Sequence, residues 1–117
     1  MNKNIYEQKA RILKAMAHPS RMAMIDALAA GERCVCELRE VVGSDMSTVS
    51  KHLSLMKSAG IVADRKVGLQ VYYRLRVPCI LKFFGCIDAV IRSNAAEQEQ
   101  LAELLPTARA TAAGKRK

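Results

Sequence analysis

The chain has 117 residues, enough for one small domain, and half of them are hydrophobic, which excludes a disordered chain. Its formal net charge of +8 favours an anionic partner, and nucleic acid is the commonest partner of a basic domain. Four cysteines without zinc-ribbon spacing, and no apolar run approaching the ~20 residues of a membrane span, predict a cytoplasmic protein with reduced thiols and no membrane partner.

The first part of the chain is predicted to form two helices. Apolar residues recur at helical spacing over 5–16, which indicates a first helix with one apolar edge. Pro19 stands where a second helix can begin, and Gly31 stands where it can end.

Two further helices are predicted around a short glycine-containing turn. A third helix over 34–42 ends before Gly43, and Ser44-Asp45 offers a cap for a fourth helix over 46–58. Two short helices joined by such a turn are typical of a helix-turn-helix.

The predicted fourth helix has two faces of different character. Met46, Val49, Leu53 and Met56 fall on one side and are expected to be buried. Short hydroxyls and a lysine on the other side suit a helix that lies in a major groove, although an ordinary solvated face has a similar composition. His52 lies near the edge of the buried face, so it has two possible roles. It can bind DNA, or it can pack and form hydrogen bonds within the protein. The predicted DNA-binding residues here are Ser47, Thr48, Ser50, Lys51, His52 and Ser54.

After the fourth helix the hydrophobic pattern becomes an alternation, which predicts two strands over 61–66 and 69–76 with a turn at Val67-Gly68. This is a hairpin of the wing type, and Arg65 and Lys66 are predicted to bind DNA from its tip.

A last long helix is predicted to begin after Pro78. Its apolar positions exceed what a small domain needs to cover, which predicts a homodimer. The predicted dimer residues are Phe83, Phe84, Ile87, Val90 and Ile91. The domain would then cover 1–105, and 106–117 would be a disordered basic tail. The fold class is mainly α with a β-hairpin (α+β), in the order helix, helix, helix, helix, strand, strand, helix.

Four segments in this order resemble one family of regulators. They are Ala17-His18-Pro19-Ser20-Arg21, Glu32-Arg33-Cys34-Val35-Cys36-Glu37-Leu38, Ser47-Thr48-Val49-Ser50-Lys51-His52-Leu53 and Gly68-Leu69-Gln70-Val71-Tyr72-Tyr73-Arg74-Leu75. Together they closely resemble the ArsR/SmtB family of winged helix-turn-helix repressors, over about residues 8 to 92. The resemblance implies a homodimer that binds an inverted repeat in double-stranded operator DNA and releases it on binding a metal or metalloid.

The two thiols of Cys34 and Cys36 are the predicted inducer site, because thiolates are soft ligands for soft metals and metalloids. In arsenic-responsive members of the resembling family a third cysteine follows this pair, whereas Arg39 stands there in this chain. Residues two apart on a helix point about 200° from each other. Cys34 must therefore precede the first turn, or binding must distort that turn. Cys79 or Cys86 would supply a third thiolate, from either subunit, although both residues also fit small buried hydrophobes at a dimer contact.

The expected inducer is arsenite or antimonite, with no organic cofactor. A soft divalent cation (cadmium, lead or zinc) and thiol oxidation are alternatives, and a DNA-binding structural protein without a sensing role is a further one. In zinc-sensing relatives the last helix carries carboxylate and histidine ligands, whereas Asp88 stands there without a histidine. No Cys-x-x-Cys or phosphate-type loop is present, so an enzyme is not expected.

Overall fold

The computed structural model describes residues 1–96 and Leu105. The chain divides into two compact units, Met1–Pro78 and Cys79–Lys117. The predicted basic tail, 106–117, lies outside the described residues. Within the described ranges, no helix has the length and apolar character that a membrane span requires.

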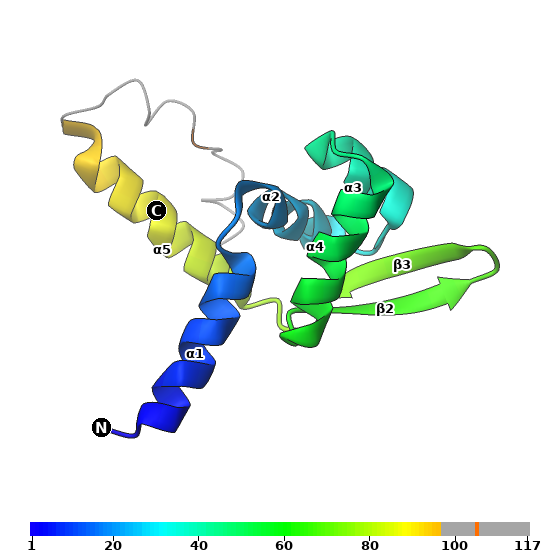
Figure 1. Cartoon of the computed structure of the whole chain (residues 1–117). Helices are drawn as coiled ribbons and strands as arrows, with labels where there is room; N and C mark the ends of the chain where they lie inside the picture. Colours follow the sequence, from blue (N-terminus) through cyan, green and yellow to red (C-terminus); the bar gives the residue numbers. More distant parts are fainter. Residues whose placement is uncertain (97–104, 106–117) are drawn as a thin grey trace. The chain divides into compact units, whose positions relative to one another are not determined.

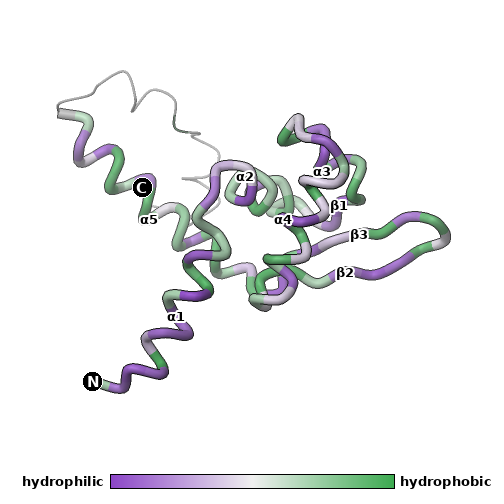
Figure 2. Tube along the Cα trace, in the orientation of Figure 1, coloured by the Kyte–Doolittle hydropathy of each residue, from purple (hydrophilic) through white to green (hydrophobic). Residues whose placement is uncertain are grey.

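The first unit begins with two helices, α1 (Lys3–Met16) and α2 (Pro19–Ala27), and a short 3-10 turn, η1 (Leu28–Ala30), follows them (Figure 1). The Asn2 side chain caps α1 by accepting a hydrogen bond from the backbone N–H of Ile5. Hydrophilic and hydrophobic residues alternate along α1 (Figure 2), and its buried residues are at its C-terminal end. The two expected helices are present, but α1 begins at Lys3 and not at residue 5, and α2 ends at Ala27 and gives way to η1 before Gly31.

The helix-turn-helix consists of α3 (Val35–Val42) and α4 (Met46–Ser58), and α4 has the bounds that the sequence predicted. Gly43 joins them with a φ of 71°, in the left-handed region that glycine adopts without a steric penalty. The carboxylate of Asp45 then accepts a hydrogen bond from the N–H of Thr48 at 2.8 Å and caps α4. This bond lowers the pKa of Asp45 below its ordinary value.

In the described part of the chain, three strands form an antiparallel sheet in the order β1-β3-β2. Their bounds are Arg33–Cys34 for β1, Val62–Val67 for β2 and Gln70–Leu75 for β3. The β2–β3 hairpin extends from the helices of this unit (Figure 1). Val67 pairs with Gln70, so the turn is Gly68-Leu69 and not the predicted Val67-Gly68. Gly68, with a φ of 62°, supplies the positive φ that a two-residue hairpin turn needs.

The core of the first unit lies between α2, α3, α4 and the start of β2. Its fully buried side chains are Met24, Ile25, Leu38, Val49, Leu53, Met56, Ile61 and Val62. Met46 was expected on the buried face of α4, but 37% of its surface is exposed, because it lies in the first turn of the helix, at the edge of this core.

In the second unit, α5 (Ile80–Ser93) is followed by the 3-10 turn η2 (Asn94–Ala96). Phe84 is buried, Ile87 and Ile91 are half-buried, and Phe83 and Val90 are exposed. The predicted role of these five residues in a dimer stays a prediction.

Candidate nucleic-acid interface and thiol site

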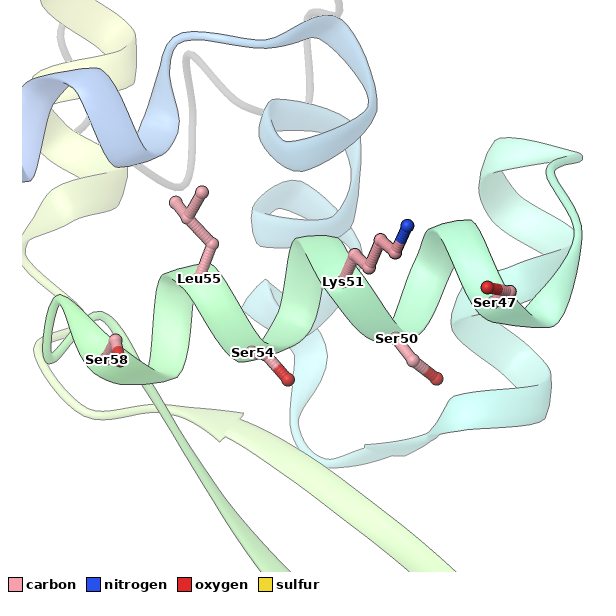
Figure 3. Close-up of a pocket in the computed structure, with 6 residues that line it drawn as sticks. All are labelled: Ser47, Ser50, Lys51, Ser54, Leu55 and Ser58. Carbon is pink, nitrogen blue, oxygen red and sulfur yellow. The ribbon is translucent and has the colours of Figure 1, made fainter.

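The outward face of α4 is a continuous row of small hydroxyl side chains. Its four serines recur at intervals of three and four residues, so they lie on one face of the helix. A shallow depression runs along this face (Figure 3), and its lining residues are Ser47, Ser50, Lys51, Ser54, Leu55 and Ser58. Thr48 is also exposed, at the first turn. Small side chains allow close approach of a DNA backbone, and hydroxyls and lysine bind phosphate oxygens and base edges.

His52 lies on a different side of α4 from this serine face. Its ring is half-buried, and its Nδ1 lies 3.0 Å from Nη1 of Arg21 on α2. The ring centroid of His18, the N-cap of α2, lies 4.5 Å from that of His52. Burial, then the neighbouring His18 and Arg21, lower the pKa of His52. These contacts suit the packing role for His52, and no sequence pattern indicated Arg21 as its partner.

Arg65 and Lys66, the two wing residues predicted to bind DNA, differ in their surroundings. Arg65 is within β2, opposite Tyr72, and not at the tip. Its guanidinium donates two 2.8 Å hydrogen bonds to the two carboxylate oxygens of Glu32, one from Nε and one from Nη2. This bidentate pair lowers the pKa of Glu32, chiefly through the hydrogen bonds. Lys66 is exposed next to the turn, where Leu69 is 99% exposed.

A second ion pair joins the wing to α4. Nζ of Lys57, in the last turn of α4, lies 3.1 Å from a carboxylate oxygen of Asp64 on β2. Since Asp64 and Arg65 are consecutive strand residues, their side chains point to opposite faces of the sheet. The wing is therefore tied to α4 through Asp64 and to the segment before β1 through Arg65.

The thiol pair spans the junction between β1 and α3. Cys34 ends β1 and is the N-cap residue of α3, with an extended backbone, and its N–H donates to Oε1 of Glu37 at 3.0 Å. Cys34 is half-buried and Cys36 is exposed in the first helical turn. Because Cys34 precedes the helix, its direction is not set by the helical spacing that would oppose it to Cys36. This is the first of the two arrangements that the sequence allowed.

The remaining candidate ligands lie in the second unit. Cys79 precedes α5 and Cys86 lies within it, and both side chains are exposed. The four cysteines, all in the described part of the chain, are free thiols. No group of three or more His, Cys, Asp or Glu side chains that could hold a metal ion occurs among the described residues.

Arg39, at the position where the resembling arsenic sensors have a third thiol, has a structural contact. Its Nε lies 3.4 Å from the backbone oxygen of Ser44 and donates a hydrogen bond to it. Arg39 thereby connects α3 to the turn that leads into α4.

Comparison with known proteins gives the same architecture. Residues 18–64 match the family described as "Bacterial regulatory protein, arsR family". The HTH-type transcriptional regulator Rv0324 of Mycobacterium tuberculosis is 32% identical over 93 residues, covering 80% of this chain and 41% of Rv0324. The transcriptional repressor SmtB homolog of Synechocystis sp. is 41% identical over 69 residues, covering 59% of this chain and 52% of that protein. The chain thus spans about half of the length of these two relatives.

A third relative is matched over most of its length. MJ1325 of Methanocaldococcus jannaschii, an uncharacterized HTH-type transcriptional regulator, is 38% identical over 81 residues, which cover 66% of this chain and 91% of MJ1325.

Two solved structures share the fold. The homodimeric winged helix-turn-helix DNA-binding domain of Mb0332 from Mycobacterium bovis has a TM-score of 0.70 and 30% identity, covering 82% of this chain and 90% of that chain. NolR from Sinorhizobium fredii has a TM-score of 0.69 and 30% identity, covering 75% and 88% of the two chains.

The helix-turn-helix, the exposed hydroxyl face of α4 and the two-stranded wing define a winged helix-turn-helix protein of the DNA-binding class. The chain belongs to the ArsR family of transcriptional regulators.

Proposed function

We propose that this protein is a cytoplasmic transcriptional repressor that binds an inverted repeat in double-stranded operator DNA as a homodimer. The observation that carries the proposal is the exposed hydroxyl face of α4, with Lys51 beside its serines and a capped N-terminus. The name of the Synechocystis relative, a transcriptional repressor, and the homodimeric M. bovis domain support it. In this arrangement α4 enters the major groove and Lys66 of the wing approaches the neighbouring backbone.

Operator binding is tested by footprinting the DNA upstream of the gene and then measuring affinity by fluorescence anisotropy at several salt concentrations. Lys51→Met should weaken binding and reduce the salt slope by about one, because one phosphate contact is lost. Lys57→Met is the matched control, since Lys57 lies on the same helix but pairs with Asp64. An equal loss of slope in both variants would show that Lys51 makes no specific phosphate contact.

We further propose that the inducer is arsenite or antimonite, held by Cys34, Cys36 and a third thiolate from Cys79 or Cys86 of either subunit. Three features support this: the position of Cys34 and Cys36 where β1 meets α3, the exposure of Cys36, and the exposure of Cys79 and Cys86. Soft thiolates prefer such ions over hard cations. The bound ion would release DNA by stabilising the state of lower operator affinity.

The inducer is tested by measuring operator affinity with and without arsenite. We expect arsenite to weaken binding by the wild type, and Cys34→Ser to abolish the response. Cys79→Ser and Cys86→Ser, tested singly, identify the third ligand by which one loses the response. Equal release in the wild type and Cys34→Ser contradicts the proposal. Release by cadmium or lead but not arsenite, or by mild oxidant with loss of two thiols, would instead support the alternative inducers.

A further inference from the structure

One face of the sheet gathers a thiol, an aromatic ring and an ion pair. Cys34 on β1 is directly opposite Tyr72 on β3, and Tyr72 is directly opposite Arg65 on β2. Directly opposed residues in an antiparallel sheet project from the same face. Cys34, Tyr72 and Arg65 therefore form one row across all three strands.

Arg65 also contacts the segment that leads into Cys34. Its guanidinium carbon is 5.7 Å from the centroid of the Tyr72 ring, and it holds the carboxylate of Glu32 in a bidentate pair. Glu32 is two residues before Cys34, so movement of the thiol segment moves the carboxylate. A bidentate pair is sensitive to such movement, because both hydrogen bonds depend on one relative orientation.

The strand that carries Cys34 is short. β1 has two residues, and its described pairing with β3 consists of Arg33 with Tyr73 and Cys34 with Tyr72. Cys34 is also the N-cap of α3, so a force on its thiol acts directly on the backbone where β1 meets α3.

We propose that the Arg65–Glu32 pair couples the thiol pair to the wing: capture of an ion at Cys34 shifts β1, separates Glu32 from Arg65 and frees the wing from its DNA-binding position. Arg65 is then a positioning residue of the wing and not the phosphate contact that its charge suggested. The inference rests on the proposed function for its biological meaning, but the mechanical link can be tested without DNA or arsenite.

The link is tested by hydrogen–deuterium exchange in a Cys36→Ser/Cys79→Ser/Cys86→Ser variant, which retains Cys34. The three replaced side chains are exposed, so the fold should persist. Methyl methanethiosulfonate then converts the Cys34 thiol to a mixed disulfide and releases methanesulfinate. We expect faster amide exchange in β2 and β3 after modification. Unchanged exchange in the wing would overturn the proposal.

Two added substitutions show whether the ion pair carries the effect. With Glu32→Gln the wing should exchange fast before modification and respond no further. Asp64→Asn is the matched control, because it breaks the other ion pair of β2, on the opposite face, and should leave the response to Cys34 modification intact. Two outcomes contradict a route through Arg65. In one, the Glu32→Gln variant still shows the full increase in wing exchange after Cys34 modification. In the other, Asp64→Asn alone removes that increase.

The consequence for sensing is measured as the ratio of operator affinities without and with arsenite. Glu32→Gln and Arg65→Gln should each reduce this ratio by roughly twofold to thirtyfold, the range in which changes along a coupling route act. The exchanged pair, Glu32→Arg with Arg65→Glu, should restore it in part. An unaltered ratio in both single variants overturns the inference. If arsenite fails to release wild-type DNA, the proposed inducer is wrong, and the exchange experiment still decides whether the link exists.

Discussion

His52 lies on α4, the second helix of the helix-turn-helix, and its side chain packs against α2 and the residue that caps it. Its half-buried ring lies against Arg21 and His18, and both neighbours disfavour a positive charge on it. The pKa of His52 is therefore below its ordinary value of 6.5 in the folded state, with burial as the largest cause. A depressed histidine pKa stabilises the fold at pH values above the unfolded-state pKa. This stability is lost as the pH falls through that value toward the folded-state pKa, because the unfolded chain binds the proton more readily.

We expect the free energy of unfolding to fall as the pH decreases from about 7 to about 5.5, across the ordinary histidine pKa. Urea denaturation at several pH values measures it. His52→Gln should lower stability at neutral pH, through the lost contact with Arg21, but make the pH dependence shallower. A variant with the full wild-type slope would show that another group causes the dependence.

Two leucines on α4 differ in burial and provide a matched pair. Leu53 is fully buried, whereas 44% of Leu55 is exposed. Leu53→Ala should lower the free energy of unfolding by about 2–5 kcal/mol, because it leaves a cavity in the core. Leu55→Ala should cost much less. Denaturant unfolding of both variants checks this, and equal losses would contradict the assigned orientation of α4.

Among the elements, α4 was the most predictable from sequence. Asp45 supplies a cap, and the apolar residues Val49, Leu53 and Met56 keep helical spacing up to the C-terminal end. The strand β1 was missed because two residues carry no periodic signal, and they become a strand by pairing with β3, which is distant in the chain. The hairpin was predicted, but its turn was placed one residue early, which put Arg65 nearer to the tip than it lies.

The turn between α3 and α4 depends on glycine at position 43. Its φ of 71° is costly for residues with a β-carbon, although an added β-carbon would meet no atom within 4 Å. Gly43→Ala should therefore lower the free energy of unfolding by about 1–2 kcal/mol through backbone strain alone. Gly43→Asn should cost less, since asparagine tolerates the left-handed region. Thermal or urea unfolding of the two variants distinguishes them, and equal costs would point to another cause.

For the whole molecule, the sequence predicted surfaces better than it predicted how the site is completed. The hydroxyl face of α4 follows from helical periodicity, and the position of Cys34 before the first turn of α3 is one of the two arrangements that the sequence allowed. The proposed third thiolate does not follow from the sequence, because Cys79 and Cys86 belong to a different compact unit from Cys34 and Cys36.

The proposed homodimer leads to a prediction about which exposed apolar residues form the dimer contact. Val90 on α5 is 59% exposed, and Val67 on the wing is 46% exposed. Val90→Asp should convert the dimer to monomer, because a carboxylate would be desolvated in the interface. Val67→Asp places the same charge on the wing and should leave the dimer intact. Size-exclusion chromatography with light scattering measures both masses. A dimeric Val90→Asp variant would mean that this position lies outside the contact.

The hydrogen bond from Arg39 to Ser44 constrains how this protein could be engineered as a biosensor. Under the proposed arsenite response, Arg39→Cys would add a third thiol to α3 and should lower the arsenite concentration needed for release of the operator. The same change removes the contact that steadies the entry to α4, so the uninduced state would hold its operator less firmly and background expression would rise. The substitution at position 39 would thus improve the detection limit of the biosensor and worsen its signal-to-background ratio.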